Sequence, residues 1–159
     1  MRDYDIPIRQ WMWRYYDAKR DVVRLEHEYD EIVSIQESAG AISYNGIPTM
    51  GNAPSDLSGM IIARDDATCR LLRAKQKQAK CYAEIIDAIS KLDYSVERDI
   101  ISMRYTWFSD GGRKTEWEEI AKQLGFSPSH IKHVHGIAIQ KLIHIVGPET
   151  LEELSTKKH

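Results

Sequence analysis

The sequence has few cysteines, and the two that it has are twelve residues apart. Cys69 and Cys81 are the only cysteines among 159 residues. Both fall on one predicted helix, where a rise of 1.5 Å per residue separates them by about 18 Å. That distance is too long for a mutual disulfide. We therefore expect two free thiols, buried as unpaired cysteines usually are.

Long apolar runs and catalytic motifs are also missing. No stretch of 18 apolar residues suggests a membrane span, and the N-terminus has no signal-peptide pattern. We expect a cytoplasmic protein without a membrane partner. The sequence has no phosphate-binding glycine loop, nucleophile elbow, HExxH pattern or pair of carboxylates in a strand-rich setting. These absences predict that the protein is not an enzyme and needs no cofactor.

The chain has no excess of positive charge. It carries 22 lysines and arginines against 24 aspartates and glutamates, with a net charge of −2 and an isoelectric point near 6.3. Any attraction to nucleic acid must therefore come from a local patch.

The most informative segment runs from Trp117 to Leu142 and has the pattern of a DNA-binding helix-turn-helix. Ile120 and Leu124 are four residues apart and share one helix face. Gly125 follows, where a chain leaving a helix usually needs a left-handed backbone. In the second helix the apolar positions are Ile131, Val134, Ile137 and Ala138. This arrangement turns Ser129, Lys132 and His133 outward, the face that such a helix lays in the major groove.

Capping residues and local charge support this interpretation. Thr115 and Glu118 fit a capping box for the first helix, and Ser127 with Pro128 fits the start of the second. From Pro128 to Val146 there is no acidic residue, while two lysines and four histidines are present. A plain helical hairpin is the alternative, and we favour DNA binding over it.

A metal site was the other interpretation of the histidines. His130, His133 and His135 lie on one predicted helix, but no cysteine or carboxylate is close in sequence. Without such ligands the spacing does not favour zinc, and we predict no metal.

The N-terminal half predicts two long helices forming an antiparallel, coiled-coil-like hairpin. Asp5 and Pro7 can start the first helix and Gly40 can end it; the glycine- and proline-rich segment 40–55 is the predicted loop. Ser55 or Asp56 caps the second helix, which runs to about Lys91. Heptad positions predict the buried seam. On the first helix these are Ile8, Trp11, Tyr15, Ala18, Val22, Leu25, Tyr29, Ile32, Gln36 and Ala39. On the second they are Leu57, Leu71, Gln78, Ile85 and Leu92, with small residues Ala67, Ala74, Cys81 and Ala88 alongside.

Four further features of the sequence lead to predictions. The basic stretch Arg70–Lys80 could contact DNA, but we favour pairing with acidic residues of the first helix, Glu26 to Glu31. Trp13 lies off the seam, which suggests an oligomer contact or packing on the C-terminal domain. In the predicted loop Tyr105–Gly112, either Trp107 or Phe108 should close the core. The polar end after Pro148 should be frayed.

The residues from Leu92 onward resemble region 4 of bacterial sigma factors. The matching pieces are Leu92, Glu97–Ile101, Met103–Tyr105, Trp117–Ala121, Gly125–Ser127, Ile131, Val134, Ala138 and Lys141–Leu142. The whole chain is similar to small phage-encoded sigma-70 region-4-like regulators of Gram-positive hosts, including late-operon activators of the RinA and ArpU type. Pro48–Asn52, followed by Ser55 and Asp56, also resembles that group.

The resemblance implies a winged-helix-like domain and specific DNA contacts. The base-reading positions of the family fall on Pro128, Ser129, Lys132 and His133. Phosphate contacts would come from the flanking residues Lys122, Arg113, Lys114, Thr115 and His130. Pro128 and Ser129 depart from the longer side chains usual in sigma factors, and proline cannot donate to a base edge, which indicates a different target sequence.

Together these observations predict an all-α transcriptional regulator in a bacterial host cell. Residues 1–91 form the hairpin, 92–147 the helix-turn-helix domain and 148–159 a flexible tail. The expected partners are double-stranded DNA, RNA polymerase and a second copy of the chain, with a dimer favoured. The hairpin would supply the dimer contact, the polymerase contact or both. Two alternatives remain: a small terminase-like subunit that recognises DNA for phage packaging, and a polymerase-binding module that does not bind DNA.

Overall fold

The computed structural model describes residues 5–44, 53–109 and 111–157. The chain divides into two compact units. One, the hairpin unit, is Ala18–Gln78 and contains most of a helical hairpin. The other joins the chain up to Asp17 with the chain from Ala79 onward.

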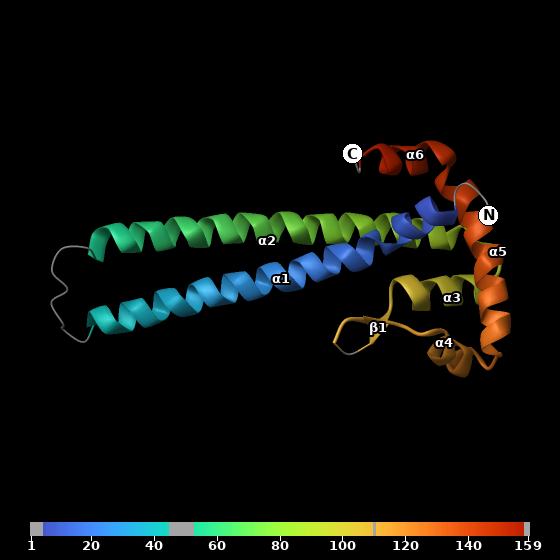
Figure 1. The fold of residues 1–159 in the computed structure, drawn as a ribbon, viewed down its shortest axis with the longest axis horizontal. Helices are drawn as coiled ribbons and strands as arrows, with labels where there is room; N and C mark the ends of the chain where they lie inside the picture. Colours follow the sequence, from blue (N-terminus) through green and yellow to red (C-terminus); the bar gives the residue numbers. More distant parts are fainter. Residues whose placement is uncertain (1–4, 45–52, 110, 158–159) are drawn as a thin grey trace. The chain divides into compact units, whose positions relative to one another are not determined.

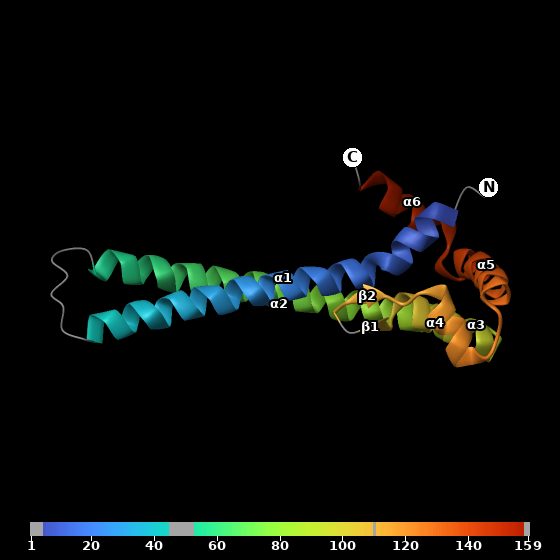
Figure 2. The ribbon, with the colours of Figure 1, turned by 60° about the horizontal axis from the view of Figure 1, so that its bottom comes forward.

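The hairpin consists of α1 (Asp5–Tyr44) and α2 (Ala53–Ser90), and it confirms the predicted seam in part. Beyond Leu25 on α1, and on α2 up to Gln78 apart from Ala67, the described seam positions are half-buried. Within Ala18–Gln78 the two helices run side by side in opposite directions (Figures 1 and 2). The heptad positions Ala18, Val22 and Leu25 of α1 and Ala67 of α2 are at most 9% exposed. Burying these side chains between the helices supplies the apolar contact that long helices need.

Ion pairs across the hairpin account for part of the basic stretch. The Arg70 guanidinium lies 3.5 Å from the Glu28 carboxylate, and the Lys75 ammonium lies 3.3 Å from that of Glu26. The predicted pairing of Arg70–Lys80 with the acids of α1 is therefore confirmed for these two cations. Each pair is about half exposed, so it sets register more than it adds stability.

The ends of the two helices differ from those expected. Gly40 does not end α1, which continues to Tyr44. One interior glycine costs only about 1 kcal/mol, which is too little by itself to stop a long helix. α2 begins at Ala53, ahead of the predicted caps Ser55 and Asp56, and this places Pro54 in the first turn, where proline is tolerated. Segment 45–52, which includes Pro48–Asn52, lies outside the described residues.

The second unit is built around α3 (Ser95–Tyr105), α4 (Trp117–Leu124), α5 (Pro128–Val146) and α6 (Pro148–Thr156). Its main core draws on the base of the hairpin as well as on these helices. The buried members are Ile8, Trp11, Met12, Ile85, Ala88, Ile89, Leu92, Ile101, Tyr105, Ala138, Ile139, Leu142, Ile143 and Leu151. The base of the hairpin and the C-terminal helices therefore share one core.

The predicted loop after α3 contains a short antiparallel hairpin, β1 (Phe108–Ser109) with β2 (Arg113–Lys114). Gly111 and Gly112 have φ of 86° and 75°, values that suit glycine in a tight turn. Phe108 packs against Tyr15 and Tyr16 of α1, with ring centroids 5.8 and 5.0 Å away. Phe108 is thus the residue that closes this side of the core, since Trp107 is 53% exposed.

The C-terminal segment is not frayed as expected. Residues Pro148–Thr156 form α6, and Leu151 is completely buried. Pro148 starts the helix in its first turn, and one apolar side chain inserted into the core is enough to fix it. The prediction was wrong because the segment is polar in composition but amphipathic in arrangement.

The two cysteines are free thiols in different surroundings. Cys81 is buried in the seam, as expected, whereas Cys69 is exposed, which the sequence did not predict. In the described part of the chain, no helix combines the length and apolarity that crossing a membrane requires.

Candidate nucleic-acid interface

α4 and α5 form a helix-turn-helix with the predicted local geometry. Gly125 closes α4 in the left-handed conformation, at φ 74° and ψ 27°, and its amide donates to the Ala121 carbonyl at 2.9 Å. The Ser127 hydroxyl accepts the His130 amide at 3.2 Å, and Pro128 occupies the first turn. The turn chemistry expected for Gly125, Ser127 and Pro128 is therefore confirmed.

A small core holds α4 and α5 at a fixed angle on α3. Ile120 and Ile131 are fully buried, and Ala121, in the same cluster, is 3% exposed. Ile100 and Met103 of α3 complete this cluster, with Val134 and Leu124 at its margin. Ile137 does not belong to it, because its side chain is 42% exposed.

The capping box of α4 is displaced by one residue from the predicted Thr115–Glu118 pair. Glu116 is the N-cap, and the Glu119 carboxylate accepts the Glu116 amide at 3.4 Å. Thr115 is instead buried, and its hydroxyl donates to the Trp107 carbonyl at 2.7 Å. The expected phosphate contact of Thr115 is therefore wrong, because its side chain is buried and already bonded. The hydroxyl joins the β-hairpin to the start of α4.

Most of the predicted DNA-facing residues lie at the surface. Those that are exposed are Pro128, Ser129, His130, Lys132 and His133 of α5, Lys122 of α4 and Arg113 of β2. α5 carries no acidic residue along its length. The structure therefore gathers one basic, acid-free face on α5.

Lys114 is placed differently from the other predicted phosphate contacts. Its ammonium lies 3.8 Å from the ring centroid of Trp13 and 4.9 Å from that of Tyr16. Such contacts hold the cation over the aromatic faces, so Lys114 serves as a packing residue. Trp13 also lies 4.5 Å from the Tyr105 ring of α3, which confirms that Trp13 packs on the C-terminal domain.

A buried polar pair stands behind the outer face of α5. The Tyr105 hydroxyl and the His135 Nε2 share a hydrogen bond of 2.9 Å. Burial, aided by the charges of Arg9 and Arg104, lowers the pKa of His135 to about 3, and burial raises the pKa of Tyr105 to about 12. His135 is therefore a neutral core residue, separate from the exposed His130 and His133. Within the described ranges no three histidine, cysteine or carboxylate side chains gather as metal ligands would.

Lys141 is held against α3 by a mostly buried carboxylate. Its ammonium lies 2.7 Å from Glu97 Oε1 and 4.6 Å from the Tyr94 ring centroid. The hydrogen bond to Glu97 raises the pKa of Lys141. Lys141 therefore lies beside the α5 face as a fixed cation whose charge is already paired.

A shallow hollow along α5 extends this face past the residues predicted from sequence. Its lining residues are Lys132, His133, Gly136, Ile137, Gln140, Lys141 and His144. The helical spacing i, i+4 and i+7 from Lys132 and His133 would have found Gly136, Ile137 and Gln140. They were missed because Ile137 was counted among the apolar positions of the second helix and Gly136 was given no role.

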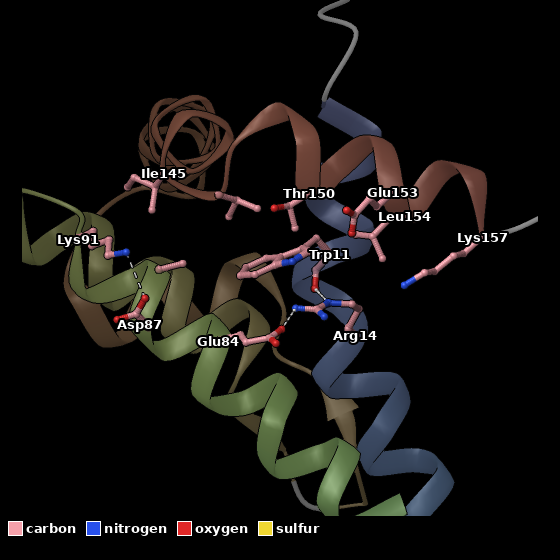
Figure 3. Close-up of a pocket in the computed structure, with 12 residues that line it drawn as sticks. Trp11, Arg14, Glu84, Asp87, Lys91, Ile145, Thr150, Glu153, Leu154 and Lys157 are labelled. Atoms are coloured by element: carbon pink, nitrogen blue, oxygen red, sulfur yellow. Dashed lines mark hydrogen bonds and ion pairs between the residues drawn. The ribbon is translucent and has the colours of Figure 1, made fainter.

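A second cavity of this unit lies between Trp11 and Arg14 of α1, the end of α2, and α6 (Figure 3). Its charged groups largely satisfy one another. Arg14 pairs with Glu84 at 2.7 Å, and Lys91 pairs with Asp87 at 3.2 Å. Three basic and three acidic side chains line the cavity, so it shows no surplus charge to select a ligand, and the α5 face is the stronger candidate site.

Comparison with known families agrees with this geometry. The family model for Sigma-70, region 4 matches residues 89–144, which is 56 of the 159 residues. The match begins within α2 and covers α3, the β-hairpin, α4 and nearly all of α5. No curated protein and no solved structure matches the chain. The matched segment is thus a sigma-region-4-like helix-turn-helix, a type of domain that binds DNA in transcription.

Proposed function

We propose that this protein is a sequence-specific, double-stranded DNA-binding regulator of transcription initiation that acts together with RNA polymerase. The observation that carries the proposal is the exposed, acid-free face of α5, held by the core that the Sigma-70, region 4 match covers. A helix of this kind enters the major groove and reads bases with its first turns. The earlier resemblance to RinA- and ArpU-type regulators supports a phage or prophage origin.

In this proposal, residues at the start of α5 contact the bases. Lys132 can donate to guanine, and Ser129 or His133 to several base edges. Lys122, Arg113 and His130 flank them and are exposed, so they would bind phosphates. Pro128 makes no such donation, and we expect a target that differs from the ordinary promoter element.

One helix-turn-helix is a small interface, so a second contact is needed. A single module buries about 600–1,000 Å² on DNA, at the low end for specific complexes. The hairpin unit exposes five large apolar side chains, each at least 49% accessible: Val23, Ile35, Ile61, Ile62 and Leu72. We propose that they support a homodimer, a polymerase contact or both.

Selection of bound duplexes from a random pool, with and without RNA polymerase, tests the function. The proposal predicts one enriched sequence motif, and an electrophoretic shift of that duplex that a scrambled duplex does not show. No enrichment and no shift under either condition would sink the DNA-binding claim. Enrichment only with polymerase would assign the affinity to a joint complex. A ring-sized assembly in solution would favour the packaging alternative over a regulator.

A further inference from the structure

The outer face of α5 continues beyond Lys132 and His133. Gly136 follows Lys132 by four residues, and Ile137 follows His133 by four, so both lie on the same side of the helix. Together with Gln140 they line the shallow hollow described above. The surface that faces outward at the start of α5 therefore extends over at least one further turn.

Gly136 has no side chain on this turn of α5, and no contact within the chain requires a glycine there. A Cβ atom built at Gly136 would meet no atom of the chain within 4 Å. Glycine in a helix interior is less stable than alanine. Since no packing constraint requires it, the missing side chain is better explained by something that approaches the helix from outside.

Ile137 supplies an apolar wall to the same hollow. It is 42% exposed on a face otherwise formed by lysine, histidine and glutamine. A single exposed isoleucine is ordinary on a protein surface. Here it is combined with the bare turn at Gly136, and the pair makes an apolar recess within a basic surface.

The far end of the recess is fixed by contacts to other helices. The Gln140 amide donates to the Asp5 carboxylate of α1 at 2.7 Å. Lys141 pairs with Glu97 of α3. These contacts hold one side of the hollow in place, and no acidic side chain of α5 itself opposes an anionic ligand.

We infer that the recess formed by Gly136 and Ile137 receives the 5-methyl group of a thymine in the major groove, making Ile137 a specificity-determining residue. This inference rests on the proposed DNA-binding function. The thymine methyl is the distinctive apolar group at the base edges of that groove. The basic surroundings suit the phosphates, while the recess suits the methyl, so duplex DNA matches both features of the site.

Replacement of thymine by deoxyuridine tests the inference, because it removes the methyl and keeps the base pair. The duplex enriched from the random pool is made with each thymine replaced in turn, and affinities are measured by fluorescence anisotropy. Wild-type protein should lose about fourfold in affinity at one thymine, which is the equivalent of about 0.8 kcal/mol for one buried carbon. Ile137→Ala should bind the original duplex and the duplex with deoxyuridine at that position equally. Gly136→Leu, which fills the recess, should also fail to distinguish thymine from deoxyuridine there.

Ile86→Ala is the matched control, because Ile86 is an exposed isoleucine on α2. It should keep the full penalty for deoxyuridine. The inference is overturned if every replacement is neutral for the wild type, if the enriched duplex contains no thymine, or if Ile137→Ala keeps the wild-type penalty. In those cases binding itself persists and only the methyl contact fails. Absence of any bound duplex would overturn the proposed function as well.

Discussion

At the scale of single residues, the α5 face separates side chains that can reach DNA from those committed to the fold. Lys132 and His133 are exposed, whereas His135 is buried against Tyr105 and Lys141 is paired with Glu97. All four are lysines or histidines of the same helix. Their roles follow from their positions around the helix: Lys132 and His133 lie on its exposed side, His135 faces the core and Lys141 reaches Glu97 of α3.

Lys132→Ala should weaken binding to the enriched duplex by about 1–3 kcal/mol if Lys132 reads a base. The loss should be smaller on duplexes altered at that one base pair, because the lost contact specified it. Competition binding with single-base variants measures this pattern. Lys122→Ala, on the neighbouring helix, is the comparison and should weaken all sequences to the same extent. Uniform weakening by Lys132→Ala would instead make Lys132 a phosphate contact.

His135 should make stability depend on pH. Its pKa is about 3 in the folded protein and near 6.5 when unfolded, so between these values only the unfolded chain takes up the proton. The free energy of unfolding therefore keeps its full value above pH 6.5. It decreases as the pH falls below 6.5, by up to about 1.4 kcal/mol per pH unit. Urea unfolding from pH 7.5 to 4.5 should show this slope in wild type and a shallower one in His135→Leu. Equal slopes in the two proteins would contradict the assignment.

At the scale of elements, short capping and turn contacts hold the recognition helix. Ser127 satisfies an orphan amide of α5, and Gly125 ends α4 in a conformation that other residues adopt only with strain. The two contacts define the angle at which α5 leaves α4. That angle decides how the exposed face of α5 is oriented towards DNA.

Ser127→Ala should therefore destabilise the protein by about 1 kcal/mol, the usual value for a lost N-cap. Thermal or urea unfolding measures the change. Ser129→Ala, two residues along and fully outside the core, provides the control and should leave stability within about 0.5 kcal/mol. If both serines behaved alike, the Ser127 hydroxyl would not be acting as a cap.

The elements also show which features could be predicted from the sequence. The hairpin seam and the α4–α5 turn were predicted correctly because heptads and caps are local patterns. Thr115, Ile137 and the α6 segment were misjudged because their burial depends on contacts with distant parts of the chain. Trp107 at the surface and Phe108 packed against α1 illustrate the same limit: adjacent aromatics are equivalent in sequence until a partner, here Tyr16, selects one.

At the scale of the whole molecule, the account requires more than one attachment to the promoter complex. A protein with a net charge of −2 gains little from general attraction to DNA, so affinity must come from the local face and from a second contact. The exposed apolar residues of the hairpin unit are the strongest structural support for that contact.

Sedimentation equilibrium should accordingly find a dimer, and the double variant Ile62→Ser, Leu72→Ser should shift it to monomer. Both side chains are more than half exposed within the chain, so their replacement should not unfold it. Tyr94→Ser, at a similarly exposed site outside the hairpin unit, should leave the dimer intact. A monomer in the wild-type protein would contradict the dimer and leave polymerase as the second contact.

Mapping the bound surface by NMR tests the central claim, that α5 meets the duplex. Amide signals of isotopically labelled protein are followed while the enriched duplex is titrated. We predict the largest changes between Ser129 and Ile137, with smaller ones at Lys122 and Arg113. Changes confined to the hairpin unit, Ala18–Gln78, with α5 unaffected, would contradict the account.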